Sequence, residues 1–429
     1  MPEKVMRNEE MWQQLGLDMD RHCELMRVLL SIYPDIYLKQ ANRPNGMGYF
    51  DIVVADIHGI RIRELFEHKQ KGGKVFGTFC IFVPEELIWA VDGIAVGLCA
   101  GADFSIRDAE DILPSNLCPL IKSFFGFKVG KLCPYFESCD IVIGETTCDG
   151  KKKVYELLQE YVPTYVIHLP QSNTEQSRIL WRQQIREFKT KVEQVSGKNI
   201  TVEALREKTE LLNNKRNALA RLFRMRQHDP VPISGKDALL ISQVGFYDNP
   251  ARFTSQVQTL CNELEERVKK GQGAINKGAP RILLTGSPMA IPNWKIHHTI
   301  ESLGAAVVCE EACIGTKYFS NPVNIPSNGN LDQLLDNIAD RYLTLPCACF
   351  SPNDDRFKKV IQLAREFKAD GVIDYNLIYC HTYSVEHTRL KKALQKENIP
   401  LLRIETDYGM GDAGQIRTRI EAFIEMISK

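Results

Sequence analysis

Cysteine is the residue type with the most potential for chemistry in this sequence of 429 residues, which contains 13 of them. Three stand where a short apolar run gives way to a loop or a helix: Cys99 follows IAVGL, Cys148 ends DIVIGETTC, and Cys380 ends GVIDYNLIYC. Thiolates are soft ligands that select zinc, copper(I) or iron–sulfur clusters. A thiolate at a helix N-terminus is further stabilised by the free amide groups there. Metal binding is therefore the first hypothesis to test.

Four further cysteines lie in segments rich in turn-forming residues. Cys118 and Cys133 each precede a proline, in LCPLIKS and KLCPYFE, which keeps the backbone at these positions out of a helix. Cys347 and Cys349 lie close together in LPCACFSPND. The sequence contains no Cys-x2-Cys pair, the spacing that is usual in structural zinc sites. These cysteines fit a site assembled from distant segments better than they fit a zinc ribbon.

The other six cysteines are interpreted as small side chains of the core or of helix faces. They are Cys23, Cys80, Cys139, Cys261, Cys309 and Cys313. Cys80 lies inside an apolar run, and Cys139 begins its strand instead of ending it, which places it at the wrong edge of a sheet for a ligand. His297, His298 and His381 have no ligand spacing around them and are interpreted as hydrogen-bonded or solvated.

Eight short apolar runs indicate the elements that must position the cysteines. They are 75–83, 94–98, 140–143, 164–169, 281–285, 305–309, 371–374 and 401–406. Strands that alternate with helices form mostly parallel sheets covered on both faces. The sequence thus predicts four regions. These are an N-terminal helical segment at 1–73, a first α/β domain at 74–170, a helical linker region at 171–275 and a second α/β domain at 276–429.

In such sheets, ligands bind beyond the carboxyl ends of the strands. Cys99, Cys148 and Cys380 are each predicted at such an end, and the last of them belongs to the second domain. We therefore expect thiolates from both domains to meet at the cleft between the two sheets. There they would hold a low-potential iron–sulfur cluster.

The composition excludes several classes of partner. Of the residues, 44% are apolar and 25% are charged, as in proteins with a folded core. Lys+Arg and Asp+Glu number 54 each, so the net charge indicates neither nucleic acid nor an anionic membrane as a partner. The basic stretch 215–226 is interpreted as the solvated face of an amphipathic helix. No apolar run reaches the roughly 18–20 residues of a membrane helix, and the charged N-terminus lacks a signal-peptide core. We predict a cytoplasmic protein.

Several motifs resemble those of a known family. PEELIWAVDGIAVGLCAG, LCPLIKSFFG, CDIVIGETTCDGKKKVYELL, RILLTGSP, ADGVIDYNLIYC and IETDYGMGDAGQIRTRIEAFIEM resemble segments of the 2-hydroxyacyl-CoA dehydratase and benzoyl-CoA reductase subunits. The likeness covers nearly the whole chain. It implies an α/β fold with two flavodoxin-like parallel-sheet domains and an additional helical region. It also implies a [4Fe–4S] cluster on three cysteines, which fall here on Cys118, Cys148 and Cys380.

The additional cysteines resemble the branch of this family called double-cubane cluster proteins. In that branch two [4Fe–4S] units share a bridging sulfide, and six cysteines hold the [8Fe–9S] assembly. The resemblance implies that Cys99, Cys133 and one of Cys347 and Cys349 supply the second set of ligands. The sequence leaves open whether the cluster is a single or a double cubane, and which of the last two cysteines binds.

The resemblance also implies a partner. A separate ATPase activator that carries its own [4Fe–4S] cluster would deliver electrons one at a time, and the chain itself is expected to form a homodimer. The sequence has no P-loop, because GFKVGKL at 126–132 has one residue too few between its glycines and no Ser or Thr after its lysine. Lys122 and Lys151 are candidates for tuning a cluster by their charge, with solvated surface lysines as the alternative.

Three hypotheses for the function remain at this point. The first is an ATP-dependent iron–sulfur oxidoreductase that reduces small molecules at a double cubane. The second is a subunit of a 2-hydroxyacyl-CoA dehydratase with a single [4Fe–4S] cluster. The third, from another class, is an electron-transfer or cluster-carrier protein without a substrate. The sequence assigns no catalytic residue and no physiological substrate.

Overall fold

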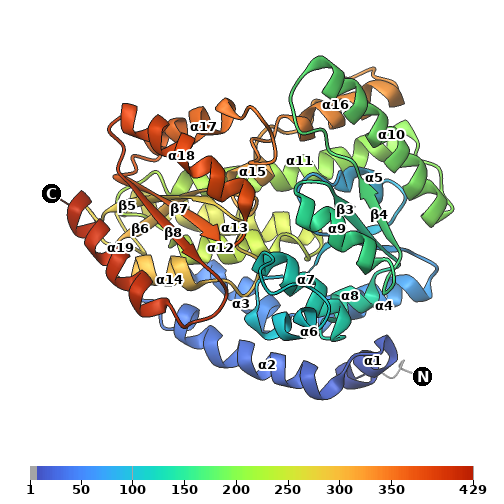
Figure 1. Ribbon diagram of the computed structural model, residues 1–429, viewed down its shortest axis with the longest axis horizontal. Coiled ribbons are helices and arrows are strands. Elements are labelled where there is room, and N and C mark those ends of the chain that lie inside the picture. Colours follow the sequence, from blue (N-terminus) through green and yellow to red (C-terminus); the bar gives the residue numbers. More distant parts are fainter. Residues whose placement is uncertain (1–6, 99, 429) are drawn as a thin grey trace.

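The computed structural model describes residues 7–98 and 100–428, and each of the eight apolar runs contributes a strand. The strands of the first half are β1 (Val75–Thr78), β2 (Ile94–Gly97), β3 (Ile141–Glu145) and β4 (Thr164–Ile167). Those of the second half are β5 (Arg281–Gly286), β6 (Ala306–Glu311), β7 (Gly371–Leu377) and β8 (Leu401–Thr406). They form two separate four-stranded sheets (Figure 1). The predicted α/β fold is confirmed.

Both sheets have the same strand order. The first is β2-β1-β3-β4 and the second is β6-β5-β7-β8, and all neighbouring strands are parallel. This is the order of the first four strands in flavodoxin-like folds. The winding of the chain reverses between β1 and β3 in the first sheet and between β5 and β7 in the second. Ligands of such sheets bind at this switch point, outside the carboxyl ends of the strands. Residues that follow these strands are therefore the first candidates for a site.

The first strand is shorter than its apolar run suggests. β1 ends at Thr78, and residues 79–83 leave the sheet as a loop before α5 (Glu85–Trp89), whose N-cap is Pro84. The expectation that Cys80 lies inside a strand is therefore wrong, because Cys80 lies in the loop at the carboxyl end of β1. Several side chains of this loop are as buried as those of a strand, which explains why the sequence pattern continues past the strand end.

Helices surround both sheets. Before β1 they are α1 (Asn8–Leu15), α2 (Met19–Tyr33), the short π-helix η1 (Pro34–Leu38), the 3-10 helix η2 (Asn45–Met47), α3 (Gly48–Ala55) and α4 (Ile60–Gln70). The first half also contains η3 (Asp103–Ser105), α6 (Ile106–Glu110), α7 (Pro119–Val129), α8 (Pro134–Ser138) and α9 (Asp149–Leu158). The second half contains α14 (Lys295–Ser302), α15 (Thr316–Phe319), α16 (Leu331–Leu343), α17 (Asp354–Glu366), α18 (His381–Lys396) and α19 (Ala413–Ile427). None of the described helices has the length and apolar character needed to cross a bilayer.

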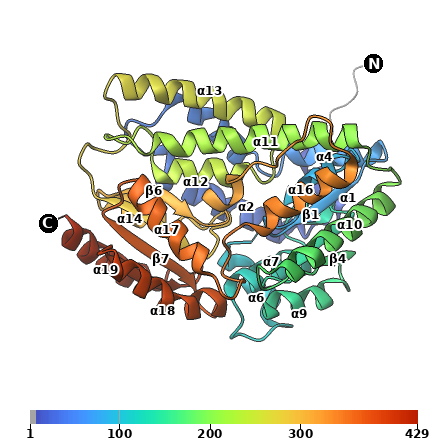
Figure 2. The same ribbon diagram turned by 90° about the horizontal axis from the view of Figure 1, so that it is seen from above.

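Four long helices connect the two sheets and contact both halves. They are α10 (Glu175–Ser196), α11 (Val202–Met225), α12 (Gly235–Val244) and α13 (Pro250–Lys269). α11 contacts α5 of the first half and α15 and α16 of the second, and it lies beside α13 (Figure 2). The indole nitrogen of the fully buried Trp181 on α10 donates to the Ala339 carbonyl of α16 over 2.9 Å. These contacts fix the position of one sheet relative to the other.

The basic stretch 215–226 at the end of α11 is only in part the solvated face that the sequence pattern suggests, with Arg224 exposed and Arg221 half-buried. Lys215, Arg216 and Arg226 are all buried. Arg216 donates to Glu86 Oε1 over 2.6 Å, and Arg226 donates to both carboxylate oxygens of Glu310 over 2.9 and 2.6 Å. Buried cations are tolerated when they are paired in this way. The carboxylates come from other elements, so the pattern of the helix alone does not reveal them.

Replacing Arg226 with alanine is expected to lower the free energy of unfolding by about 3–5 kcal/mol, because Glu310 would stay buried without its cation. Denaturant unfolding of the purified variant measures this loss. The exposed pair of Lys358 and Asp355 provides a control, since Lys358→Ala should cost less than about 1 kcal/mol. Losses of similar size in both variants would contradict the interpretation of the Arg226 pair.

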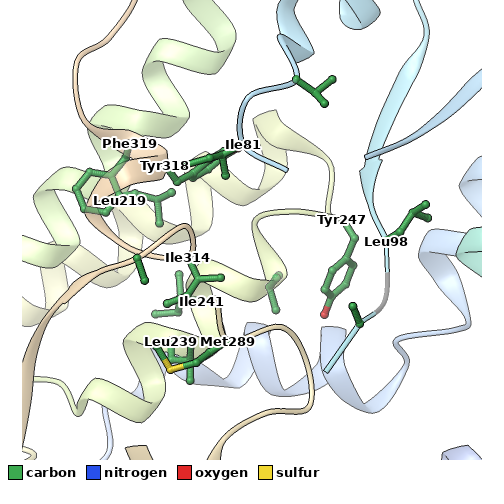
Figure 3. Packing of buried hydrophobic residues seen from close by; sticks show 14 of the residues in the cluster. Ile81, Leu98, Leu219, Leu239, Ile241, Tyr247, Met289, Ile314, Tyr318 and Phe319 are labelled. Atoms are coloured by element: carbon green, nitrogen blue, oxygen red, sulfur yellow. The ribbon is translucent and has the colours of Figure 1, made fainter. Parts of the chain in front are cut away.

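A continuous hydrophobic core joins the two halves of the molecule. Ile81 and Leu98 come from the loops after β1 and β2, Leu219 comes from α11, and Tyr318 and Phe319 come from α15 (Figure 3). All five side chains belong to one buried cluster. The carboxyl end of the first sheet is thereby packed against the second half without an intervening solvent layer at this point.

Gly101 allows the backbones of the two halves to approach each other closely. Its φ is +135°, and a Cβ atom at this position would lie 2.4 Å from the Ala290 carbonyl oxygen in the loop after β5. On the other side, the hydroxyl of Ser123 accepts a hydrogen bond from the Gly101 amide over 3.1 Å. A side chain at this position would separate the loops that follow β2 and β5.

Candidate metal centre

Four of the predicted ligands stand immediately before the first turn of a helix: Cys133 is the N-cap of the five-residue helix α8, and the other three cap longer helices. Cys118 is the N-cap of α7, Cys148 of α9 and Cys380 of α18. α7 and α9 lie on the side of the first half that faces the second half (Figure 1). The first amides of a helix have no partner within it, and the helix dipole adds partial positive charge there. We call these three cysteines the first thiol group.

The fold brings the first thiol group together from both halves of the chain. Cys118 donates a hydrogen bond to Cys380, which raises the pKa of Cys118 and lowers the pKa of Cys380 to about 6. The hydroxyl of Ser287, which follows β5, also hydrogen-bonds to Cys380. Burial raises the pKa of Cys148, and the Lys151 amide opposes this effect by donating to Sγ over 3.5 Å. Backbone and hydroxyl donors therefore surround these thiols.

The helix that carries Cys148 packs tightly against the helix that carries Cys118. A Cβ atom on Gly150 would lie 2.9 Å from Ile121 Cδ1 and 3.1 Å from Leu117 Cδ1. A larger residue in the first turn of α9 would therefore push the two helix N-termini apart. This close approach explains the glycine that follows the Cys-Asp pair in the CDGKKK motif.

A second group of four thiols lies close by, and we call Cys80, Cys313, Cys347 and Cys349 the second thiol group. Cys80 follows β1, Cys313 follows β6, and the other two lie in the loop between α16 and α17. Burial raises the pKa of Cys80 and of Cys313 to about 12, and the charge of Cys347 adds to the effect at both. A hydrogen bond from Cys349 lowers the pKa of Cys347 to about 6. Each thiol group thus contains one hydrogen-bonded thiol pair.

Two buried cations of the second half lie against the second thiol group. Lys317 is 1% exposed, and its Nζ lies 3.0 Å from Glu311 Oε1 and 3.0 Å from the Tyr383 hydroxyl. Arg356 is also 1% exposed, and its guanidinium lies 3.3 Å from Glu311 and 4.8 Å from the centre of the Tyr383 ring. Both charges lower the pKa of Cys347, after the larger effects of its hydrogen bond and its burial.

Lys151 connects the two thiol groups. It lies one helical turn after Cys148, and its buried ammonium pairs with the fully buried Glu145 at the end of β3. Burial has the largest effect on the pKa of Cys80 and raises it, whereas the charge of Lys151 lowers this pKa. The Tyr155 hydroxyl donates to Glu145 over 3.4 Å. Burial raises the pKa of Tyr155, and the charges of Cys80 and Cys148 raise it further. Side chains of α9 therefore adjoin both thiol groups.

Lys122, the other lysine that the sequence singles out, points elsewhere. Its Nζ donates to Glu110 over 2.6 Å and to the Ser115 carbonyl over 2.8 Å. It is buried on α7, the helix that Cys118 caps. The structure therefore distinguishes the two candidate lysines, because Lys122 is held by Glu110 and the Ser115 carbonyl, whereas Lys151 pairs with Glu145 one turn after Cys148.

The donor chemistry and the position of the thiols fit an iron–sulfur cluster. Six of the seven keep partial solvent-accessible surface although they lie deep in the protein: Cys80, Cys148, Cys313, Cys347, Cys349 and Cys380. Within residues 7–98 and 100–428, no three His, Cys, Asp or Glu side chains are arranged to hold a single metal ion. Soft thiolate donors in this number suit an iron–sulfur cluster.

Two predicted ligands are not part of these groups as the structure describes them. Cys99 lies outside the described residues, so its role stays a prediction. Cys133 is fully buried and lies beside Cys139. Cys139 precedes β3 at the amino end of β1, and its thiol donates to the Tyr135 carbonyl over 3.1 Å. This is the edge of the sheet opposite to the one at which Cys148 lies.

The sequence interpretation missed Cys80 and Cys313 as candidates. A usable signal existed for Cys80, because the run 75–83 is longer than the buried strands of this sheet and ends at Pro84. For Cys313 the signal was its place just after a strand, which is also where Cys148 and Cys380 stand. The sequence alone does not show which strand ends are adjacent, and the strand order supplies this information.

Comparison with known proteins adds independent information. The model of the family described as 2-hydroxyglutaryl-CoA dehydratase, D-component, matches residues 80–427. A protein of Escherichia coli strain K12 named "Putative dehydratase subunit YjiM" is 40% identical over 84% of this chain and 93% of its own length. The (R)-phenyllactyl-CoA dehydratase beta subunit of Clostridium sporogenes is 22% identical over 84% of this chain and 93% of its own. A subunit of the benzoyl-CoA reductase of Thauera aromatica is 20% identical over 82% of this chain and 91% of its own.

Proposed function

Because the chain belongs to the 2-hydroxyglutaryl-CoA dehydratase D-component family, we propose that it is an iron–sulfur reductase of small molecules. The relatives in this family are named as subunits of dehydratases and of a reductase. The observation that carries the proposal is the presence of two adjacent thiol groups, where a single cluster needs only one. The thiols of the two groups together exceed the six that a double cubane requires.

The first thiol group would hold one half of an [8Fe–9S] double cubane. For the second half we propose Cys80, Cys313 and one of Cys347 and Cys349. In this set, Cys80 and Cys313 take the places that the family resemblance gives to Cys99 and Cys133. The set is supported by the shared charge interactions and hydrogen bond of its members.

When bound, such a cluster supplies single electrons at low potential. The protein's own part is to hold thiolates in place and to compensate their negative charge. At the first thiol group, three helix N-termini compensate the negative charge of the thiolates. At the second thiol group, this charge is compensated by three side chains, Lys151, Lys317 and Arg356. The low exposure of these cations keeps water away from them, which strengthens their electrostatic effect.

The proposal includes a separate protein as the electron donor. Within the described residues we find no phosphate-binding loop, and 126–132 form the end of α7 and a turn. We propose an ATPase activator with its own [4Fe–4S] cluster as the donor, and a homodimer as the working form. Gel filtration of the anaerobically purified protein measures the oligomeric state directly.

Two other functions remain as alternatives. A 2-hydroxyacyl-CoA dehydratase subunit would hold a single [4Fe–4S] cluster on the first thiol group, and the names of the relatives favour this class of reaction. It leaves the four thiols of the second group without a role. A cluster carrier without a substrate would use the same thiols but would not turn over with the activator.

Iron and sulfide quantification distinguishes the double cubane from the single cluster. We expect anaerobically purified protein to contain about eight iron atoms per chain, where a single [4Fe–4S] cluster would give about four. Acid-labile sulfide is measured on the same sample, and electron paramagnetic resonance (EPR) reports the cluster type. A value near four would support the dehydratase alternative. Protein that stays free of iron after anaerobic reconstitution would refute both.

A further inference from the structure

Asn353 occupies the N-cap position of α17 but does not cap this helix. Its side chain makes no hydrogen bond to the first turn of α17, and the residue is only 6% exposed. Two other asparagines at N-caps do form such bonds. The side chain of Asn330 accepts from the Gln333 amide of α16, and that of Asn249 accepts from two amides of α13. The buried side chain of Asn353 is therefore used for other contacts.

The amide group of Asn353 holds the loop between α16 and α17. Its Nδ2 donates to the Cys347 carbonyl over 2.8 Å and to Glu386 Oε1 over 2.6 Å, which uses both protons of the nitrogen. The Cys347 carbonyl also accepts from the Phe350 amide over 3.2 Å, and the Cys347 amide donates to the Leu345 carbonyl over 2.9 Å. Both backbone polar groups of Cys347 are thereby fixed at the start of a tight turn.

The second partner of Asn353 is itself held in place. Glu386 lies on α18, and its other carboxylate oxygen accepts from Arg356, which is 1% exposed. α18 is the helix that Cys380 caps, and it lies beside α17 (Figure 1). Asn353 therefore ties the turn at Cys347 to the helix that carries Cys380 of the first thiol group.

Cys349 lies inside the same turn and is anchored less firmly. Within the described part of the chain, we find no hydrogen bond between the backbone of Cys349 and another backbone group, whereas the backbone of Cys347 makes three hydrogen bonds. Metal ligands are held within narrow geometric limits by the residues behind them. Of the two thiols, that of Cys347 is therefore attached to the better fixed backbone.

We propose that Asn353 is a positioning residue of the second thiol group and that it makes Cys347, and not Cys349, the ligand of this group. Its bond to the Cys347 carbonyl fixes the turn from which the thiol projects. Its bond to Glu386 sets the place of this turn relative to α18 and thus to Cys380. A cluster that spans both thiol groups requires such a fixed spacing. This inference rests on the proposed function.

The test compares the release of iron to an anaerobic chelator from wild type and from Asn353→Asp. Aspartate is as good an N-cap as asparagine, but its carboxylate cannot donate and would face the Cys347 carbonyl and the Glu386 carboxylate. We expect about half of the iron in Asn353→Asp to leave about tenfold faster or more, as is usual when the residue behind a metal ligand is changed. The remaining iron, at the first thiol group, should leave at the wild-type rate.

Asn330→Ala is the control for a purely structural effect, because it removes a hydrogen bond that does cap a helix. Its iron release should match that of the wild type. The choice of ligand is tested by iron content, for which we expect about four atoms per chain in Cys347→Ala and about eight in Cys349→Ala. Adding Asn353→Asp to Cys347→Ala should leave the release of the remaining iron unchanged, because the thiol that Asn353 positions is then absent.

Three results would each overturn the inference. They are a wild-type release rate in Asn353→Asp, an equal acceleration in Asn330→Ala, and loss of iron in Cys349→Ala with none in Cys347→Ala. Should Asn353→Asp fail to fold, the two cysteine variants still test the choice of ligand. About four iron atoms in the wild type, or none, would instead refute the proposed function.

Discussion

Cys148→Ala is expected to lose most of its iron when it is purified and reconstituted anaerobically. Cys148 belongs to the first thiol group, whose three members come from different helix starts and from both halves of the chain. Removing one thiolate leaves an iron atom without a protein ligand at a position where only backbone amides remain. The neighbouring α9 side chains adjoin the second group, so the loss should extend to the other half of the cluster.

The control for this variant is Cys23→Ala, because Cys23 is exposed on α2 and lies in neither thiol group. Its iron content should equal that of the wild type. Circular dichroism of both variants would show that the fold is kept, since alanine is tolerated at a helix N-cap at a cost of about 0.5–2 kcal/mol. Equal iron in Cys148→Ala and Cys23→Ala would count against the whole assignment.

Cys313→Ala is expected to lower the iron content from about eight to about four per chain, because the first thiol group can still hold one [4Fe–4S] unit. Cys313 follows β6, whereas Cys347 and Cys349 both lie in the loop between α16 and α17, so the Cys313 thiol comes from a separate segment of the chain. Iron quantification and EPR on the variant measure the change. The remaining signal should be that of an isolated cluster.

Cys133→Ala is the matched variant for this second prediction, because the family resemblance assigns Cys133 to the ligands and the structure places it beside Cys139. We expect it to keep its full iron content. The reverse result, with iron lost in Cys133→Ala and kept in Cys313→Ala, would favour the ligand set implied by the resemblance. A comparison of Cys347→Ala with Cys349→Ala would show which thiol of that pair binds.

The sequence predicts the eight strands well because each is a short apolar run between turn-forming residues. It fails at the end of β1, where the chain leaves the sheet but stays buried against the second half. Local pattern reports burial and not hydrogen bonding, so a buried loop and a buried strand look the same. The burial of Arg216 and Arg226 is not predicted for a related reason. Their partners Glu86 and Glu310 lie far away in the sequence.

Some residues of the candidate site can likewise be recognised from the sequence, and others cannot. Cys148 and Cys380 are visible in the sequence because each stands between a strand and a helix. Cys80 and Cys313 also follow strands, but their closeness to each other depends on the order of the strands and on the packing of the two halves, which the sequence does not show. Buried ion pairs such as that of Lys317 and Glu311 are equally hidden, since a lysine in sequence is indistinguishable from a surface residue.

The wide separation of the first thiol group along the chain has a consequence for biosynthesis. Cys380 leaves the ribosome roughly 230 residues after Cys148, at a translation rate of about 5–20 residues per second. During that interval the nascent first half exposes two cysteines that lack their third partner. If the proposed ligand set holds, metal insertion follows release of nearly the entire polypeptide, and chains that terminate early would be unable to mature.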